Sequence, residues 1–184
     1  MILKTRFWLL FGIVVLGSGF DFPLQKNTTS PEYQVKAVFL FNFTQFIEWP
    51  TVAFSNTDSP MIIGILGKDP FKDYIDETVR GEKINGHPLI VERFEKPEDI
   101  QTCHILFISE TEKKQLKNIL QSLGNKKILT VSDMMDFAKQ GGMIRFVTEN
   151  NKTRIRVNLE ATKEADLIVS SKLLRLAEIV STSK

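Results

Sequence analysis

The stretch that decides the fold reads Gly141-Gly-Met-Ile-Arg-Phe-Val-Thr-Glu149, Asn150-Asn151, then Lys152-Thr-Arg-Ile-Arg-Val-Asn-Leu-Glu160. Its two halves alternate between apolar and polar residues, which is the two-residue period of a β-strand. Asparagine tolerates the positive φ that a type I′ turn requires at both central positions. The stretch therefore predicts a β-hairpin with Asn150-Asn151 as its loop, and the pair Gly141-Gly142 marks the turn into it.

The loop determines which residues face each other across the hairpin. The apolar side chains share one face: Ile144, Phe146, Ile155 and Val157. A shift of the register by one residue would mix the two faces. The other face carries the guanidinium groups of Arg145, Arg154 and Arg156, and in this register Arg145 lies directly opposite Arg156.

Two guanidinium groups that face each other repel unless an anion lies near them. One interpretation of Arg145 and Arg156 is therefore a small anion site or a contact for an acidic partner. The alternative is a solvated face with both side chains directed into water near Glu160, because exposed charge pairs contribute little to stability. The sequence alone leaves both interpretations open.

The chain after the hairpin is expected to be helical. Residues 159–168 suggest a short helix, and Ser170 or Ser171 is a good N-cap for a second one. An apolar stripe with helical spacing follows: Leu173, Leu176, Ala177 and Val180. We expect this stripe to pack against the core.

Upstream of the hairpin, strands and helices alternate. Strands are expected over 61–66, 89–94, 103–108 and 127–131, and helices over 31–47, 70–79, 111–123 and 134–140. Such alternation indicates parallel strands with right-handed crossovers. The prediction is a single α/β domain with a mixed, mostly parallel sheet, helices on both faces and a C-terminal antiparallel hairpin.

The helix expected over 31–47 is rich in aromatic residues. Ser30 and Pro31 favour its start, and Trp49-Pro50 ends it. Its apolar arc is wide: Val35, Val38, Phe39, Leu40, Phe43, Phe46 and Ile47. Phe41 falls instead in the polar arc, with Thr44 and Gln45. An exposed Phe41 is either ordinary surface or part of a partner-binding surface.

The first residues of the chain have the order of a secretory signal. Lys4 and Arg6 precede an apolar run over 7–16, and the small residues of 17–19 supply a cleavage site. We expect a signal peptide over 1–19, a polar leader over 20–30 and the folded domain over 31–184. An uncleaved membrane anchor is the alternative.

Composition and motifs argue against catalysis. The 184 residues carry a formal net charge of +2, and there is no basic run that would indicate nucleic-acid binding. No nucleophile elbow or dinucleotide fingerprint occurs. The single cysteine, Cys103, begins an apolar strand, so we expect it to be buried and inert, with intermolecular pairing as the alternative. His104 follows it on the opposite strand face, so the two cannot share a metal ion.

The sequence therefore predicts no enzyme, no cofactor and no metal site. A more specific function comes from three segments whose order and spacing match a known family. They are Tyr33-x-Val-Lys-Ala-x-Phe-Leu-Phe-Asn-Phe-x-x-Phe-x-x-Trp49-Pro50, then Cys103-His-Ile-Leu-Phe-Ile-Ser109 with Ile128-Leu-Thr-Val-Ser-Asp133, then Phe137-Ala, Gly141-Gly142-Met-Ile, Asn158-Leu and Ser170-Ser-Lys-Leu-Leu174. Together these segments resemble the YfiR family of small exported regulators from Gram-negative bacteria.

The resemblance implies a periplasmic inhibitor. Family members are implied to bind the periplasmic sensor region of an inner-membrane diguanylate cyclase, which lowers cyclic-di-GMP signalling and biofilm formation. A peptidoglycan-associated outer-membrane lipoprotein is implied to relieve the inhibition. The exposed aromatic and arginine residues are the expected partner-binding groups: Phe41, Trp49, Arg145, Arg154 and Arg156. The alternative is a periplasmic small-ligand-binding module with an arginine-lined anion site. A homodimer is left open, and no nucleic-acid partner is expected.

Overall fold

The hairpin predicted from the sequence forms in the computed structural model, which describes residues 29–182. Asn150 and Asn151 have φ values of 51° and 58° and close the loop. Phe146 pairs with Ile155, and Arg145 pairs with Arg156, so the predicted register is confirmed. The expected signal peptide and most of the polar leader, residues 1–28, lie outside the described residues.

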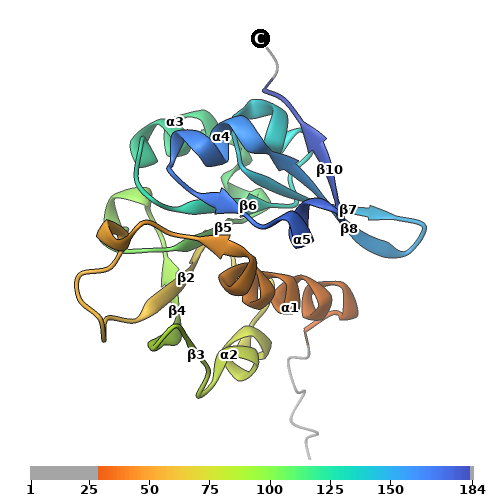
Figure 1. Ribbon diagram of the computed structural model, residues 1–184. Coiled ribbons are helices and arrows are strands. Elements are labelled where there is room, and N and C mark those ends of the chain that lie inside the picture. Colours follow the sequence, from red (N-terminus) through yellow and green to blue (C-terminus); the bar gives the residue numbers. More distant parts are fainter. Residues whose placement is uncertain (1–28, 183–184) are drawn as a thin grey trace, which may run out of the picture.

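The strands assemble into one large sheet and one small sheet. Their bounds are β1 Ile47–Glu48, β2 Met61–Leu66, β3 Lys83–Ile84, β4 His87–Phe94, β5 Ile105–Ile108, β6 Leu129–Ser132, β7 Ile144–Glu149, β8 Lys152–Asn158, β9 Ile168–Val169 and β10 Ala177–Val180. The large sheet has the order β10-β8-β7-β6-β5-β2-β4-β3, and β1 pairs with β9 in the small one. The tip of the β7–β8 hairpin projects from the body of the molecule (Figure 1).

Most neighbours in the large sheet are parallel. The pairs β4–β2, β2–β5, β5–β6, β6–β7 and β8–β10 are parallel, whereas β7–β8 and β3–β4 are antiparallel. The central strands β2, β5 and β6 are buried along their whole length, as expected for parallel strands covered on both faces. The predicted mixed, mostly parallel sheet is thus confirmed.

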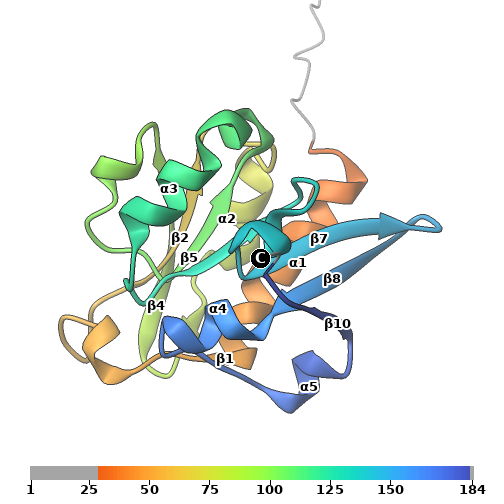
Figure 2. The ribbon, with the colours of Figure 1, turned by 90° about the horizontal axis from the view of Figure 1, so that it is seen from above.

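Helices cover both faces of this sheet (Figures 1 and 2). Their bounds are α1 Pro31–Phe46, α2 Asp73–Val79, α3 Leu116–Leu123, α4 Leu159–Glu164 and α5 Ser171–Leu174, with 3-10 turns at Thr51–Ala53, Pro97–Asp99, Glu110–Gln115 and Phe137–Gln140. One core cluster joins α1 and α2 to side chains such as Ile63, Phe107 and Phe146. A second cluster packs α3 against Leu106 and Ile108 on the opposite face.

The burial of α1 differs from the predicted arc. Val35 and Val38 are 45% and 41% exposed, whereas Thr44 is buried. The helix is therefore turned so that Leu40 lies at the middle of its buried face. Thr44 enters the interior because its hydroxyl group donates a hydrogen bond to the Phe41 carbonyl at 2.6 Å, which leaves the methyl group to pack.

The prediction that the second C-terminal helix continues to Val180 is wrong. Only residues 171–174 are helical, with the Ser170 hydroxyl accepting a hydrogen bond from the Lys172 N–H. Residues 177–180 form β10, which extends the sheet parallel to β8. Leu176 is 67% exposed rather than part of a core stripe. Pairing with β8 overrides the helical spacing of four apolar residues.

Three upstream helices are also shorter than expected, and one of them, α2, begins at Asp73 rather than at residue 70. The segment that follows β6 forms a 3-10 turn over Phe137–Gln140 instead of a helix from 134, because Asp136 takes a left-handed conformation with a φ of 59°. The helix expected from 111 begins with a 3-10 segment, and α3 proper starts at Leu116. Within residues 29–182, no helix has the length and apolar character needed to cross a membrane.

Candidate partner-binding surfaces

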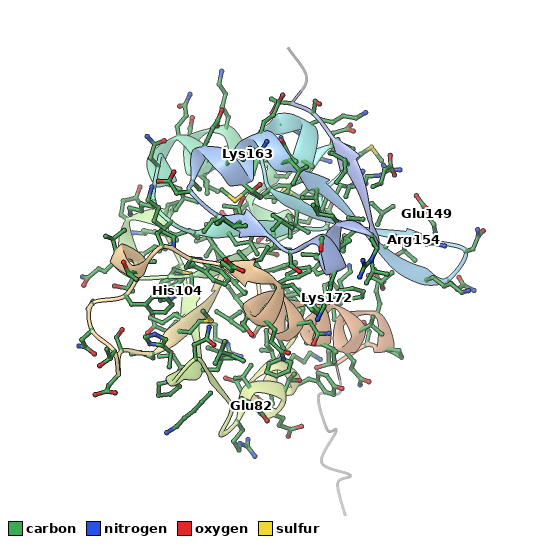
Figure 3. The ribbon with its side chains drawn as sticks, in the orientation of Figure 1. Glu82, His104, Glu149, Arg154, Lys163 and Lys172 are labelled. Atoms are coloured by element: carbon green, nitrogen blue, oxygen red, sulfur yellow. The ribbon has the colours of Figure 1, made fainter. Side chains whose placement is uncertain are left out.

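The arginines of the hairpin face are partly neutralised by glutamates. Arg156 donates hydrogen bonds from Nε to Glu178 at 2.8 Å and from Nη2 to Glu149 at 3.3 Å. The Nε atom of Arg154 lies 4.0 Å from the same Glu149 carboxylate. Glu149 and Arg154 lie together at the projecting hairpin in Figure 3. The expected neighbour, Glu160, is not the residue that pairs with either arginine.

Arg145 differs from the two other arginines. It makes no ion pair with any residue in 29–182, and its half-buried side chain holds an Nε–H group that has no hydrogen-bond partner in that part of the chain. Because Arg156 already has two carboxylates, an anion held between the paired arginines would compete with Glu149 and Glu178. The Nε–H group of Arg145 is itself buried, so Arg154, whose side chain is 61% exposed, is the hairpin arginine best placed to pair with a carboxylate of another molecule.

A fourth arginine joins this surface. Arg175, which follows α5, lines a groove of about 230 Å³ together with Arg154, Arg156 and Leu176. We call Arg145, Arg154, Arg156 and Arg175 the arginine surface. Sequence reasoning missed Arg175 because the residues around it were assigned to one long helix. The strand register of β10, which places Glu178 beside Arg156, was missed for the same reason.

Trp49 lies in a different groove from the arginines. It follows β1 and packs its half-buried ring against the edge of the His104 imidazole, with ring centroids 6.3 Å apart. Phe54 is stacked between His104 and His87, at centroid distances of 4.5 Å and 3.9 Å. The indole N–H of Trp49 is buried and has no hydrogen-bond partner among the described residues.

Both ring nitrogens of His104 lie within hydrogen-bond distance of backbone groups of the fold. Its Nδ1 atom accepts a hydrogen bond from the Ile62 N–H at 3.0 Å, and Nε2 lies 3.1 Å from the Ala53 carbonyl, so Nε2 carries the proton. Burial lowers the pKa of His104 to about 4. The ring is therefore neutral at neutral pH and joins β2 to the turn over 51–53.

Phe41 does not project into solvent as the sequence suggests. It is half-buried and packs against the core cluster beneath α1. The residues of α1 with the most exposed apolar surface are Val35 and Val38 instead. A partner that contacts this helix would therefore meet these valines more readily than Phe41.

The expected site residues do not form one surface. The groove that contains Trp49 and the groove that contains Arg154 and Arg156 share no lining residue. The two grooves also lie at different ends of the strand order, beside β3 and beside β10. In Figure 3, His104 and Arg154 lie on opposite sides of the molecule. The structure therefore places Trp49 and the hairpin arginines in two separate regions.

A buried charged cluster fixes α1 to the end of β6. Lys36 is 2% exposed, and its ammonium group lies 2.6 Å from the Asp133 carboxylate and 2.8 Å from Glu32. The Tyr33 hydroxyl donates to the same Asp133 oxygen at 2.8 Å, and burial followed by this hydrogen bond raises the pKa of Tyr33. The hydrogen bond from Lys36 lowers the pKa of Glu32. Sequence reasoning missed this cluster because a lysine on a helix is usually solvated.

The single cysteine, Cys103, is buried, as the sequence predicts. Cys103 is 6% exposed, and burial raises its pKa to about 12, so its thiol is protonated at neutral pH. Within residues 29–182, no group of three or more His, Cys, Asp and Glu side chains is placed to hold a metal ion.

These features define a class of protein: a mixed α/β domain with two surface grooves at the two ends of its sheet. The model of the family described as YfiR/HmsC-like matches residues 33–178, and the chain belongs to this family. The match includes α1 from Tyr33 onward, the charged cluster apart from Glu32, both grooves and β10 up to Glu178. No curated protein sequence matches the chain significantly.

Proposed function

We propose that this protein is a periplasmic regulator that binds the periplasmic sensor region of an inner-membrane diguanylate cyclase and inhibits it. The observation that carries the proposal is the family match over residues 33–178. A regulatory rather than an enzymatic role is consistent with this family. In this proposal, binding lowers cyclic-di-GMP synthesis, and an outer-membrane lipoprotein relieves the inhibition.

The proposed location follows from the charged, apolar and small residues of the first 19 positions, which have the order of a signal peptide. Export places the folded domain in the same compartment as the sensor region of an inner-membrane cyclase. Cleavage near Gly19 would leave the polar leader and the domain as the mature chain. The cyclase and the regulator can then meet without either protein crossing the membrane.

The arginine surface is a proposed contact for the cyclase. Arginine and aromatic residues often contribute most of the energy of a protein interface. Arg154 is 61% exposed with only a long contact to Glu149, so its guanidinium group can pair with a carboxylate of a partner. Arg156 is held by two glutamates, and its role in this proposal is to keep the hairpin face ordered.

Capture from a membrane extract tests this proposal. The mature chain, immobilised through its C-terminus, should retain a diguanylate cyclase from a detergent extract of the inner membrane. Arg154→Ala should weaken the capture, and the matched variant Lys139→Ala, which removes another exposed cation with a 3.6 Å pair to Asp136, should not. Failure of the unsubstituted chain to retain any cyclase would contradict the proposal.

A further inference from the structure

A second groove is formed by residues of α1, β1, β3 and the turns beside them, and it encloses about 710 Å³. It is lined by Thr44, Gln45, Ile47, Glu48, Trp49, Phe54, Met61, Lys83, Ile84, Asn85 and His87. Its volume lies within the range of about 300–1,000 Å³ that is typical of ligand-binding sites. The groove of the arginine surface shares none of these residues, so this groove calls for a ligand of its own chemistry.

Part of the lining is apolar and withdrawn from solvent. Ile47 and Met61 are buried, and Trp49, Phe54 and Ile84 are half-buried. Aromatic rings supply a large share of this surface, and such rings bind apolar groups through contact area. A ligand that fills this part of the groove must therefore present an apolar face.

A stack of three rings holds one acceptor in place. Phe54 is stacked between His104 and His87, and both nitrogens of His104 are bound to the backbone. The Nδ1 atom of His87 lies 2.7 Å from the Ser59 carbonyl, so Nδ1 carries the proton of the neutral ring. Nε2 is therefore the one polar atom of His87 left for a ligand. It has no hydrogen-bond partner among residues 29–182 and is not buried.

Most of the remaining lining is polar and exposed. Four exposed side chains make no hydrogen bond or ion pair with another residue in 29–182: Gln45, Glu48, Lys83 and Asn85. The amide groups of Gln45 and Asn85 both donate and accept hydrogen bonds. The charges of Glu48 and Lys83 are opposite and cancel. The groove therefore suits a ligand without net charge whose polar atoms both donate and accept.

A saccharide combines these properties. A pyranose ring carries hydroxyl groups that both donate and accept, and its faces present C–H groups that pack against aromatic rings. A ligand with a net charge would meet a like charge on Glu48 or Lys83. A wholly apolar ligand would cover the polar groups without replacing their hydrogen bonds to water. We propose that this groove binds a short neutral saccharide, a role that does not depend on cyclase inhibition.

Trp49 provides a direct reporter for this groove. The chain has two tryptophans, and Trp8 lies in the expected signal peptide, so Trp49 is the only tryptophan of the mature chain. The probes are cellobiose and N,N′-diacetylchitobiose, two neutral disaccharides, titrated against the mature chain while its tryptophan emission is recorded. At least one of them should change the emission with a saturable dependence on concentration. Sorbitol, which carries hydroxyl groups without a ring, should not.

Two exposed glutamines form a matched pair of test positions. Gln45 on α1 lines the groove, whereas Gln121 on α3 does not. We expect Gln45→Ala to weaken disaccharide binding by about threefold, since one hydrogen bond is lost, and Gln121→Ala to leave it unchanged. His87→Phe keeps an aromatic ring beside Phe54 and removes the Nε2 acceptor, so it should weaken binding by about tenfold.

The inference is overturned if neither disaccharide changes the emission saturably, or if sorbitol changes it in the same way. It is also overturned if Gln45→Ala and His87→Phe both bind as the natural chain does, because the sugar then lies elsewhere. Should His87→Phe not fold, Gln45→Ala decides alone. Saturation by N-acetyl-leucine amide at a lower concentration than by either disaccharide would assign the groove to a peptide instead. Each of these results leaves the inhibitor proposal standing, since no cyclase takes part in the titration.

Discussion

His104 couples the stability of the fold to pH. The folded protein keeps this ring neutral down to a pH of about 4, because burial opposes its charge. An unfolded chain takes up the proton near a pH of about 6.5. Between these values the unfolded state binds more protons than the folded state, so stability is full above the upper value and falls as the pH falls.

We predict that the free energy of unfolding decreases from pH 6.5 to pH 4 by up to about 1.4 kcal/mol per pH unit through His104. Urea unfolding at several pH values measures this slope. His104→Gln should flatten the slope even if it lowers stability, since the titrating group is gone. His87→Gln, which leaves His104 in place, should retain it. Identical slopes for the natural chain and His104→Gln would contradict this assignment.

Asp133 neutralises a lysine that has almost no contact with solvent. Its carboxylate holds both the Lys36 ammonium group and the Tyr33 hydroxyl group. Removal of one member of a buried ion pair leaves the other charge uncompensated, which typically costs about 3–5 kcal/mol. Glu32 also contacts Lys36 but is itself 47% exposed, so it compensates only in part.

We predict that Asp133→Ala lowers the free energy of unfolding by about 3 kcal/mol. The double variant Lys36→Met with Asp133→Ala should recover part of this loss, because no buried charge remains. Lys139→Ala removes an exposed lysine nearby and should change stability by less than about 0.5 kcal/mol. Chemical denaturation of the four proteins provides the comparison. A change within that same small range for Asp133→Ala would show that the cluster does not hold α1.

Single residues differ in how well the sequence predicts them. Asn150 and Asn151 were predictable because few residues other than glycine tolerate positive φ, and Cys103 because it begins an apolar run. The burial of Lys36 was not predictable, because its partner Asp133 is 97 residues away in the sequence. Phe41 was predicted to be exposed because it falls among the polar residues of the helix, but its ring packs against the core cluster.

At the scale of elements, the hairpin loop Asn150-Asn151 is the short segment that determines the register of β7 and β8. Both loop residues have left-handed backbone conformations. Glycine adopts this conformation without cost, whereas a residue with a Cβ atom other than Asn or Asp loses about 1–2 kcal/mol there. Since the loop sets the register of β7 and β8, it also sets which arginines share a face.

We predict that Asn151→Ala destabilises the protein by about 1 kcal/mol and that Asn151→Gly leaves it within about 0.5 kcal/mol of the natural chain. Both variants remove the same side-chain amide, so their difference isolates the backbone conformation. Thermal or urea unfolding measures that difference. Equal stabilities of the two variants would mean that the loop does not require a left-handed residue at this position.

Whether a segment forms a helix or a strand was predictable where local sequence signals agree. It was not predictable where pairing with a distant strand decides the outcome. The buried strands β2, β5 and β6 and the start of α1 follow from apolar runs, prolines and turn residues. β10 does not, because its apolar residues fit helical spacing equally well and only pairing with β8 decides. That error concealed Arg175 and Glu178, so the arginine surface was only partly predictable.

At the scale of the whole molecule, the two ends of the sheet have different chemistry. The β10 end carries the arginine surface, with an unpaired donor on Arg145. The β3 end carries a groove lined by aromatic side chains, among them Trp49 and Phe54. A single partner that contacts both ends would therefore have to span the molecule.

The central claim is that this protein, once exported, holds a diguanylate cyclase inactive. The most direct measurement is the cellular cyclic-di-GMP level in a strain that lacks the protein, compared with the same strain supplied with the full chain or with a chain that lacks residues 2–19. Loss of the protein should raise cyclic-di-GMP, the full chain should restore the low level, and the leaderless chain should not. An unchanged level after loss of the protein, or restoration by the leaderless chain, would contradict the account.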